Sequence, residues 1–428
     1  MNDTTEFPES ARAVGGLIGE IAKYTMTQAP RPNYPLAFAG ALAFVSHLAA
    51  RRYRTRSNSR PNLMLLALAW SGTGKDAPRK TNKELARAIG IQNTIIDSFR
   101  SGEALEDTVL TTPRTLSQYD EIDALLDCIK SSRDALGVNL MSMMLTLWGE
   151  SAGYHVRRRL ANSGKAKVHD QTPDCVMHPH FTLFGTGVTA QVYKAISDKM
   201  ATNGFFARLL VIDAGQRGEG QDTVYMPPPA DLVEKCRLLC GQPQEDQKSP
   251  EDDPAWGGTG YIVPSTAGAD AAKLEALKDA DLHYNRDEDG AENAIWNRTV
   301  EKCEKLALVF ALSEHPESPV ITEDHWRLAR ELVYYSNKCQ LKTLEKYSAE
   351  TDYQDIQKRV LRRIAKGRIC DRALLKNSHM KHDDLIEVLD TLRASGQIIY
   401  CNEHGEEVAT ESGRITSAER SGLYYALP

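Results

Sequence analysis

Residues 62–76 read NLMLLALAWSGTGKD, in which a continuous apolar run passes directly into a turn with two glycines and a lysine. A run without polar alternation is typical of a strand that is covered on both faces of a parallel sheet. A polar segment with helical spacing follows from about Pro78 to Ile89. The order strand, glycine-rich turn and helix predicts an α/β core whose first loop can hold an anion at a helix N-terminus.

The turn also fits the phosphate-loop pattern G-x4-G-K-[ST], in which backbone N–H groups surround the phosphates and the lysine reaches the β and γ oxygens. The residues predicted to bind ATP are Ser71, Gly72, Thr73, Gly74, Lys75 and Asp76. Two positions depart from the pattern, because Ala69 replaces the first glycine and Asp76 replaces the hydroxyl that contacts Mg²⁺. A carboxylate can bind Mg²⁺ but adds negative charge beside a polyanion. The alternative interpretation is an ordinary strand-to-helix turn.

A second stretch supplies the acids that hydrolysis of ATP requires. Asp120 and Glu121 follow a run of residues that ends at Tyr119. We predict that Asp120 and Asp76 hold Mg²⁺ and that Glu121 activates the attacking water. These acids would also suit the first turn of a helix, where carboxylates meet the positive end of the helix dipole. Glu103 is the alternative base.

Two further candidates lie at the ends of predicted strands. Thr186 follows the run that includes Phe184 and is placed to sense the γ-phosphate, although a turn threonine would give the same pattern. Arg208 enters an apolar strand that ends at Ile212, where an unpaired cation is unfavourable. It is either an arginine finger that reaches the ATP of a neighbouring subunit or a member of a structural ion pair.

A cluster of cations follows residue 154. It comprises Arg157, Arg158, Arg159, Lys165 and Lys167, with small and polar residues between them. Such a loop can follow a phosphate backbone, so we predict that it binds single-stranded or forked DNA. A solvated helix face is the alternative for a run of charges.

Changes in composition and periodicity divide the chain into five regions. They are an N-terminal helical region (1–60), a P-loop ATPase core (61–215), an acidic linker or loop (216–258), a helical subdomain (259–350) and a winged helix-turn-helix (353–428). The linker is rich in Pro, Gly and acidic residues, and we expect it to be mobile. The last region combines three helical patterns with two apolar runs, which is the order of a winged helix.

Bulk properties restrict the class of protein. The chain has 428 residues and a net charge of -6. Because the chain as a whole is negative, any contact with nucleic acid must come from local basic patches. The eight cysteines form no C-x2-C pair, as expected of a reduced cytoplasmic protein. Cys175, His178 and His180 could form half of a metal site, but no second pair of ligands stands nearby, and we favour a buried strand approach. The apolar segment 35–50 is too short for a bilayer, and the start of the chain has no secretory pattern, so we expect no membrane contact.

Three stretches, 51–77, 101–126 and 204–213, resemble a family of phage and mobile-element ATPases of largely unassigned function, which is related to the hexameric replicative helicases of the RecA-like kind. The motifs that carry the resemblance are PNL at 61–63, SGTGKDAP at 71–78, DEID at 120–123 and GFFAR at 204–208. The resemblance implies a RecA-like core, a homo-oligomeric ring with active sites shared between subunits, DNA unwinding, and a primase or other replication protein as partner. In some RecA-like motors the base lies on the strand before the metal-binding acid, which keeps Glu103 open beside Glu121.

The final region carries charges of opposite sign in its two halves. Its first half is basic, with Lys358, Arg359, Arg362, Arg363, Lys366, Arg368 and Arg372. Its third helical segment carries Asp383, Asp384, Glu387 and Asp390, which would repel DNA in a major groove. The region therefore suits protein docking as well as DNA binding. Two functions fit the sequence: a DNA-dependent ATPase of the helicase kind, and a nucleotide-controlled DNA-binding or assembly protein with little hydrolysis.

Overall fold

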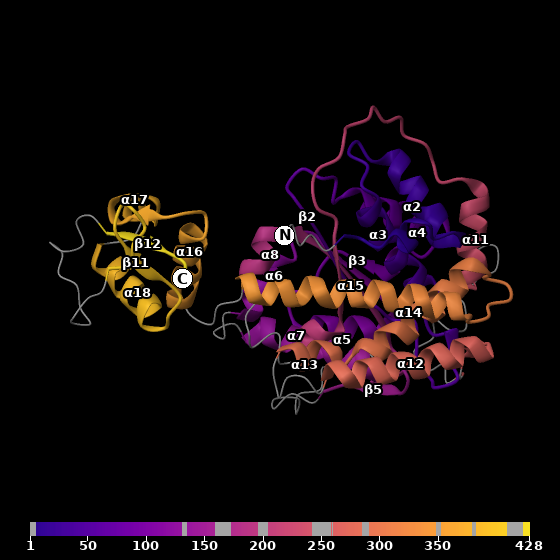
Figure 1. Cartoon of the computed structure of the whole chain (residues 1–428). Helices are drawn as coiled ribbons and strands as arrows, with labels where there is room; N and C mark the ends of the chain where they lie inside the picture. The colour runs from indigo at the N-terminus through magenta and orange to yellow at the C-terminus, as the bar shows by residue number, and fades with distance from the viewer. Residues whose placement is uncertain are drawn as a thin grey trace, which may run out of the picture. The chain divides into compact units, whose positions relative to one another are not determined.

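The computed structural model of the chain divides into two compact units, Met1–Leu344 and Glu345–Pro428 (Figure 1). The structure describes residues 6–130, 135–158, 173–195, 204–241, 258, 260–284, 291–347, 352–378, 382–408 and 423–428. Each unit buries apolar side chains of its own.

The first unit is built on a five-stranded sheet in which all strands are parallel. In spatial order the strands are β3 (Ile95–Ile96), β4 (Arg114–Tyr119), β7 (His180–Val188), β2 (Met64–Ala69) and β8 (Leu209–Asp213). Every residue of β2 is buried, as its continuous apolar run predicts. The mixed α/β class and the parallel sheet are therefore confirmed, and they are compatible with a RecA-like core.

A buried helix, α3 (Tyr34–Leu48), packs against four of these strands. Its start is fixed locally, because the Asn33 side chain accepts a hydrogen bond from the Leu36 N–H at 3.1 Å and Pro35 occupies the first turn. The predicted buried helix in this segment is confirmed. In the part of the chain that the structure describes, no helix is both long and apolar enough to span a membrane.

Further elements surround the sheet. Among the described residues before 348, the other α-helices are α1 (Glu9–Arg12), α2 (Gly16–Gln28), α4 (Ala77–Ala88), α5 (Gly102–Thr111), α6 (Asp123–Lys130), α7 (Ala135–Glu150), α8 (Thr189–Ala195), α10 (Phe205–Arg208), α11 (Ala230–Cys240), α12 (Ala267–Tyr284), α13 (Ala291–Trp296), α14 (Thr299–Glu314) and α15 (Glu323–Tyr347). Two small strand pairs join β1 (Tyr53–Arg54) to β9 (Tyr261–Ile262) and β5 (Tyr154–Val156) to β6 (Cys175–Met177).

The segment predicted to be an acidic linker, 216–258, contains the helix α11. Cys236 and Leu239 are fully buried on this helix, which packs against α2, α3 and α4. The prediction of an uninterrupted loop is therefore wrong over 230–240. The apolar residues of this stretch recur at helical spacing, and that periodicity outweighs the polar composition of its flanks.

The order of the connections creates a switch point between β2 and β7. The chain leaves β2 for β3 at one edge of the sheet, whereas it leaves β7 for β8 at the other edge. In open parallel sheets, ligands bind outside the carboxyl ends of the strands at such a point. The predicted phosphate loop follows β2 at this position, and Thr186 lies near the carboxyl end of β7.

The described residues of the second unit form three helices and a three-stranded antiparallel sheet. Its elements are α16 (Asp352–Ile364), β10 (Ile369–Cys370), α17 (Asp371–Ser378), α18 (His382–Ala394), β11 (Ile399–Cys401) and β12 (Tyr424–Ala426), with strand order β10-β12-β11. Val360, Leu374, Leu389 and Tyr425 belong to one buried core. The three helices and the last two strands follow the predicted order, β10 is additional, and the winged-helix assignment stays a prediction.

Candidate functional site

The loop after β2 adopts a conformation that favours glycine at two positions. Gly72 and Gly74 have φ angles of 72° and 85°, in the left-handed region. A Cβ atom on Gly74 would lie 2.6 Å from the carbonyl oxygen of Arg31, so the loop packs directly on the turn between α2 and α3. The helix α4 begins at Ala77, which brings a helix N-terminus next to the loop.

Lys75 lies close to the acids that follow β4. Its Nζ donates a hydrogen bond to the carbonyl oxygen of Trp70 at 3.2 Å. Burial lowers the pKa of Lys75, and the carboxylates of Asp120, Asp123 and Glu121 act in the opposite direction. The structure thus brings together the lysine after β2 and the acids after β4, although β7 separates the two strands.

Thr186 connects β7 to the first of these acids. Its side chain is fully buried, and its Oγ1 lies 3.2 Å from the Tyr119 carbonyl oxygen and 3.4 Å from Asp120 Oδ1. The Ile122 N–H in turn donates to the Thr186 carbonyl at 3.0 Å. These contacts tie the end of β4 to β7, so Thr186 orients Asp120 toward the switch point.

Both predicted metal ligands face cations of α4. Asp76 Oδ2 lies 2.5 Å from Lys80 Nζ, and this hydrogen bond lowers the pKa of Asp76. Asp120 Oδ1 lies 2.8 Å from Arg79 Nη2. Nearby, the buried Oδ1 of Asp123 has no hydrogen-bond partner within the described part of the chain. Within the described part of the chain, no three His, Cys, Asp or Glu side chains are grouped closely enough to form a metal site by themselves. Carboxylate oxygens suit Mg²⁺, so Asp76 and Asp120 fit as single ligands of an ion that phosphate oxygens also hold.

Glu121 stands at a turn with an unusual backbone conformation. Its φ angle is 50°, which is uncommon for a residue with a side chain. Its side chain is exposed, so water has access to the carboxylate. Strained backbone of this kind often accompanies functional sites. Its position next to Asp120 supports the predicted role as base.

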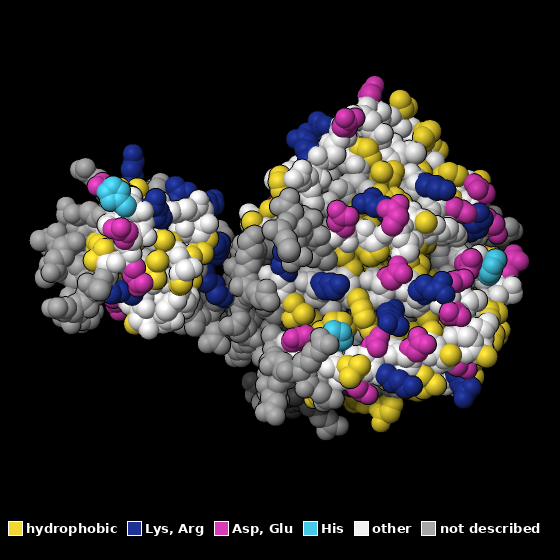
Figure 2. All heavy atoms as spheres, in the orientation of Figure 1, with side chains coloured by type: hydrophobic (Ala, Val, Ile, Leu, Met, Phe, Trp, Pro, Cys, Tyr) yellow, Lys and Arg dark blue, Asp and Glu magenta, His cyan; other side chains and the backbone are white. Residues whose placement is uncertain are grey.

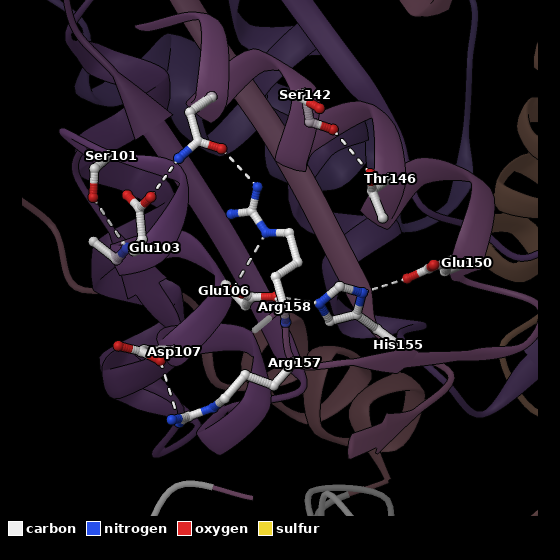
Figure 3. Close-up of polar contacts among 12 residues, drawn as sticks. Ser101, Glu103, Glu106, Asp107, Ser142, Thr146, Glu150, His155, Arg157 and Arg158 are labelled. Atoms are coloured by element: carbon white, nitrogen blue, oxygen red, sulfur yellow. Dashed lines mark hydrogen bonds and ion pairs between the residues drawn. The ribbon is translucent and has the colours of Figure 1, made fainter. Parts of the chain in front are cut away.

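The alternative base, Glu103, lies in the first turn of α5 rather than on a strand. Its carboxylate accepts a hydrogen bond from the Asn139 side chain of α7 (Figure 3). A hydrogen bond to its own backbone lowers the pKa of Glu103, and Ser101 and Asn139 act in the same direction. The Glu121 carboxylate interacts electrostatically with Lys75, whereas the Glu103 carboxylate is hydrogen-bonded to Asn139 of α7. The geometry therefore favours Glu121 over Glu103 as the base.

The described cations of the predicted DNA-binding loop are paired with carboxylates of α5 (Figure 3). Arg157 Nη2 lies 3.3 Å from Asp107 Oδ1, and Arg158 donates to Glu106 from its backbone N–H at 2.9 Å. These two arginines follow the strand β5 and are held by α5, so the predicted loop does not begin at residue 154. Their contact with DNA stays a prediction. Arg159, Lys165 and Lys167 lie outside the described residues.

Arg208 ends α10 and lies at the amino edge of the sheet, because the next residue, Leu209, pairs with Met64 at the start of β2. Its Nη1 donates to the Gly204 carbonyl at 2.8 Å, and burial lowers its pKa. No carboxylate forms an ion pair with it among the described residues. A strand of six residues places this edge roughly 20 Å from the phosphate loop of the same chain. Arg208 therefore lies too far from the phosphate loop of its own chain to contact a ligand there.

Two residues of the proposed metal half-site lie on strands, since Cys175 begins β6 and His180 begins β7. His178 lies in the bend between these strands, with a φ of 49°. The predicted strand approach is therefore confirmed for Cys175 and His180 but is wrong for His178. His180 is fully buried, with its Nε2 3.0 Å from Thr182 Oγ1. Burial lowers the pKa of His178 to about 4. These histidines are therefore neutral at pH 7.

A segment that joins the end of the predicted core to the start of the predicted linker lies along the phosphate loop. Residues 214–221, here called the strap, are joined to the loop by the Trp70 N–H, which donates to the Gly215 carbonyl at 3.3 Å. The Gln221 N–H donates to the Pro30 carbonyl at 3.1 Å. The strap belongs to the loop that leads into α11 at the top of Figure 1.

The strap brings a further cation to the site. Arg217 Nη1 lies 3.5 Å from the position that a Cβ atom on Gly72 would occupy. Together with Arg79 and Asp123, it is a residue of the site that sequence reasoning did not assign. Arg79 and Asp123 stand next to predicted site residues and could have been proposed, whereas only the fold brings Arg217 to the loop.

No protein-family model matches the sequence, and no curated protein matches it either.

Proposed function

We propose that the protein is a cytoplasmic DNA-dependent ATPase with a RecA-like P-loop core, acting as a ring-forming replicative helicase or helicase-like replication factor. The observation that supports ATP hydrolysis is the convergence of Lys75 with Asp120 and Glu121 at the switch point of a parallel sheet. ATP and Mg²⁺ are the cofactors of this proposal.

Binding begins at the phosphate loop. The backbone of Gly72 and Gly74 and the N-terminus of α4 surround the phosphates, while Lys75 exchanges the Trp70 carbonyl for the β and γ oxygens. Mg²⁺ supplies positive charge that offsets the charge of the triphosphate. Asp120 and Asp76 are the residues that would hold it, and Thr186 keeps Asp120 in place.

Hydrolysis requires a base beside the γ-phosphate. Glu121 accepts a proton from water as the water oxygen bonds to the γ-phosphorus. The bond between the γ-phosphorus and the β–γ bridging oxygen breaks, and ADP and phosphate leave. The exposed carboxylate of Glu121 is suited to this role because solvent water reaches it directly.

The DNA and ring parts of the proposal have separate support. They follow from the resemblance of the motifs at 71–78, 120–123 and 204–208, and from the position of Arg208, which lies too far from the phosphate loop of its own chain to contact a ligand there. In Figure 2, Lys and Arg side chains gather over the side of the second unit formed by α16. This basic side is the surface that we propose for contact with the DNA backbone.

A second candidate function is a nucleotide-controlled DNA-binding or assembly protein with little hydrolysis. The ion pairs Asp76–Lys80 and Asp120–Arg79 favour it, because both carboxylates must leave a cation before they can hold Mg²⁺. Tight nucleotide binding with slow turnover would be the signature of this alternative.

Measuring ATP turnover with and without single-stranded DNA tests the proposal. Lys75→Ala should lower turnover by about 100-fold or more, because the cation that contacts the transferred phosphate is lost. The fold should remain intact, since Lys75 contributes little to the core. Lys83→Ala is the matched control, because this lysine of α4 is half-exposed and pairs with Asp97.

The pattern of results separates the functions. Turnover that requires Lys75 and rises with DNA supports the ATPase, and a Glu121→Gln protein should then retain ATP without hydrolysing it. Equal turnover in wild-type and Lys75→Ala proteins would remove the proposal. Nucleotide binding that requires Lys75, without turnover in any condition, would favour the second candidate.

A further inference from the structure

We propose that Arg217 binds the phosphates of the nucleotide held by the phosphate loop of the same chain. This inference rests on the proposed function and extends it, because it adds a second cation to the phosphate site. The cation comes from the strap, which follows β8, and not from the loop after β2.

The position of Arg217 is fixed on both sides along the chain. Before it, Gly215 turns the chain with a φ of 66°, and its carbonyl accepts the hydrogen bond from the Trp70 N–H. After it, the Gln221 side-chain amide donates to the carbonyls of Met26 at 2.8 Å and Ala29 at 3.0 Å. The strap is thus held between the phosphate loop and the end of α2, with Arg217 between its two attachments.

The guanidinium of Arg217 is available to a ligand. The residue is exposed, and within the described part of the chain its side chain forms no ion pair or hydrogen bond. Two other cations beside the loop differ, since Arg79 pairs with Asp120 and Lys80 pairs with Asp76. Arg217, like Lys75, can therefore meet an anion without first breaking an ion pair.

The charge and shape of the group fit phosphate. Arg217 Nη1 stands beside Gly72, a glycine of the loop predicted to surround the phosphates, whereas Lys75 faces the acids after β4. The two cations therefore approach a bound nucleotide from different strands. A planar guanidinium can donate two parallel hydrogen bonds to phosphate oxygens, which an ammonium cannot do in the same geometry.

Calorimetric titration of the full-length protein with Mg·ADP and with Mg·AMP-PNP tests the inference. Arg217→Ala should weaken binding of both nucleotides by about tenfold or more, as expected for the loss of a charge-assisted contact. Arg217→Lys should recover part of the affinity, because lysine keeps the positive charge but cannot donate two parallel hydrogen bonds to phosphate. Arg327→Ala is the matched control, since Arg327 is an exposed arginine that pairs with Glu323 on α15.

The outcomes distinguish this inference from the proposed function. If the wild-type protein binds neither nucleotide, or binds them independently of Lys75, the proposed function fails and the inference fails with it. If binding requires Lys75 but Arg217→Ala binds as tightly as Arg327→Ala, only the role of Arg217 is overturned. Thermal unfolding at an unchanged temperature shows that a loss of affinity in Arg217→Ala does not come from unfolding.

Discussion

At the scale of single residues, two lysines of α14 are buried without a carboxylate within ion-pair distance among the described residues. Lys302 Nζ donates to Asn337 Oδ1 at 2.9 Å, and Lys305 Nζ donates to Asn62 Oδ1 at 2.6 Å. Burial lowers the pKa of Lys302 to about 7 and that of Lys305 to about 8. An ammonium ion away from water is costly, so the fold favours the neutral amines.

These lysines predict a pH dependence of stability. Well below pH 7 the amines of Lys302 and Lys305 are protonated in both the folded and the unfolded chain. Above the lowered pKa values they are protonated only in the unfolded chain, where lysine has its ordinary pKa of 10.5. The free energy of unfolding should therefore rise from pH 7 to pH 9. Burial raises the pKa of Cys303 to about 12, which opposes this rise above its ordinary pKa of 9.

Urea unfolding at pH 7, 8 and 9 measures this dependence. Lys302→Met should give a shallower rise than the wild-type protein, because one of the two titrating groups is gone. Lys338→Met, at an exposed position of α15, is the control and should keep the wild-type slope. An unchanged slope in Lys302→Met would show that this lysine stays charged in the folded chain.

Residue-level prediction from the sequence selected residues that lie near one another where a short motif carries them, and their chemical roles stay predictions. Lys75 and the acids at 120–121 were predicted from short motifs, and the fold brings them together. Their approach across β7 could not be derived from spacing. Arg217 gave no signal at all, because its relation to Gly72 depends on hydrogen bonds between distant segments.

At the scale of elements, α15 covers the edge of the sheet that β8 forms. The Val211 N–H of β8 donates to Ser336 Oγ at 2.7 Å, and the Asp213 N–H donates to the Tyr335 hydroxyl at 3.0 Å. Side chains of a helix thus take the place of a sixth strand. An uncovered edge would present unpaired backbone groups to other chains.

Ser336→Ala should lower the free energy of unfolding by about 1–3 kcal/mol, because the buried Val211 N–H loses its acceptor. Chemical denaturation measures the change. Lys338→Ala, two residues further along the same helix, should change stability by less than about 0.5 kcal/mol. If the two variants are equally stable, the hydroxyl of Ser336 contributes nothing to holding the edge.

The elements themselves were predicted unevenly. Strongly apolar segments such as β2 and α3 were predicted correctly, because continuous runs of apolar residues indicate buried elements. The helix α11 and the strand β5 were missed within segments predicted to be loops. Both are short, and the packing of α11 on α2 and the pairing of β5 with β6 hold them in place.

At the scale of the whole molecule, a shared active site makes a prediction about mixtures. Lys75→Ala and Arg208→Ala proteins should each be inactive, because one cannot bind phosphate properly and the other cannot complete its neighbour's site. In an equal mixture, about one interface in four pairs an intact Lys75 with an intact Arg208, so up to about a quarter of wild-type turnover should return.

The mixture needs two controls. Subunit exchange must be shown with labelled proteins. Arg208→Ala mixed with a Lys75→Ala/Arg208→Ala double variant is the second control, because that mixture contains no intact Arg208 and should show no recovery. If turnover does not return although subunits exchange, Arg208 has a structural role within its own chain and does not complete a neighbour's site.

The central position of α3 also has a consequence for synthesis of the chain. This helix ends at Leu48, but its contacts include β8, which begins at Leu209. A ribosome that adds about 5–20 residues per second needs roughly 8–30 s to make the intervening segment. During that interval the nascent polypeptide carries an apolar helix that its own later strands have yet to cover. Chains arrested before residue 209 should therefore bind a hydrophobic dye or a chaperone, and chains released at full length should not.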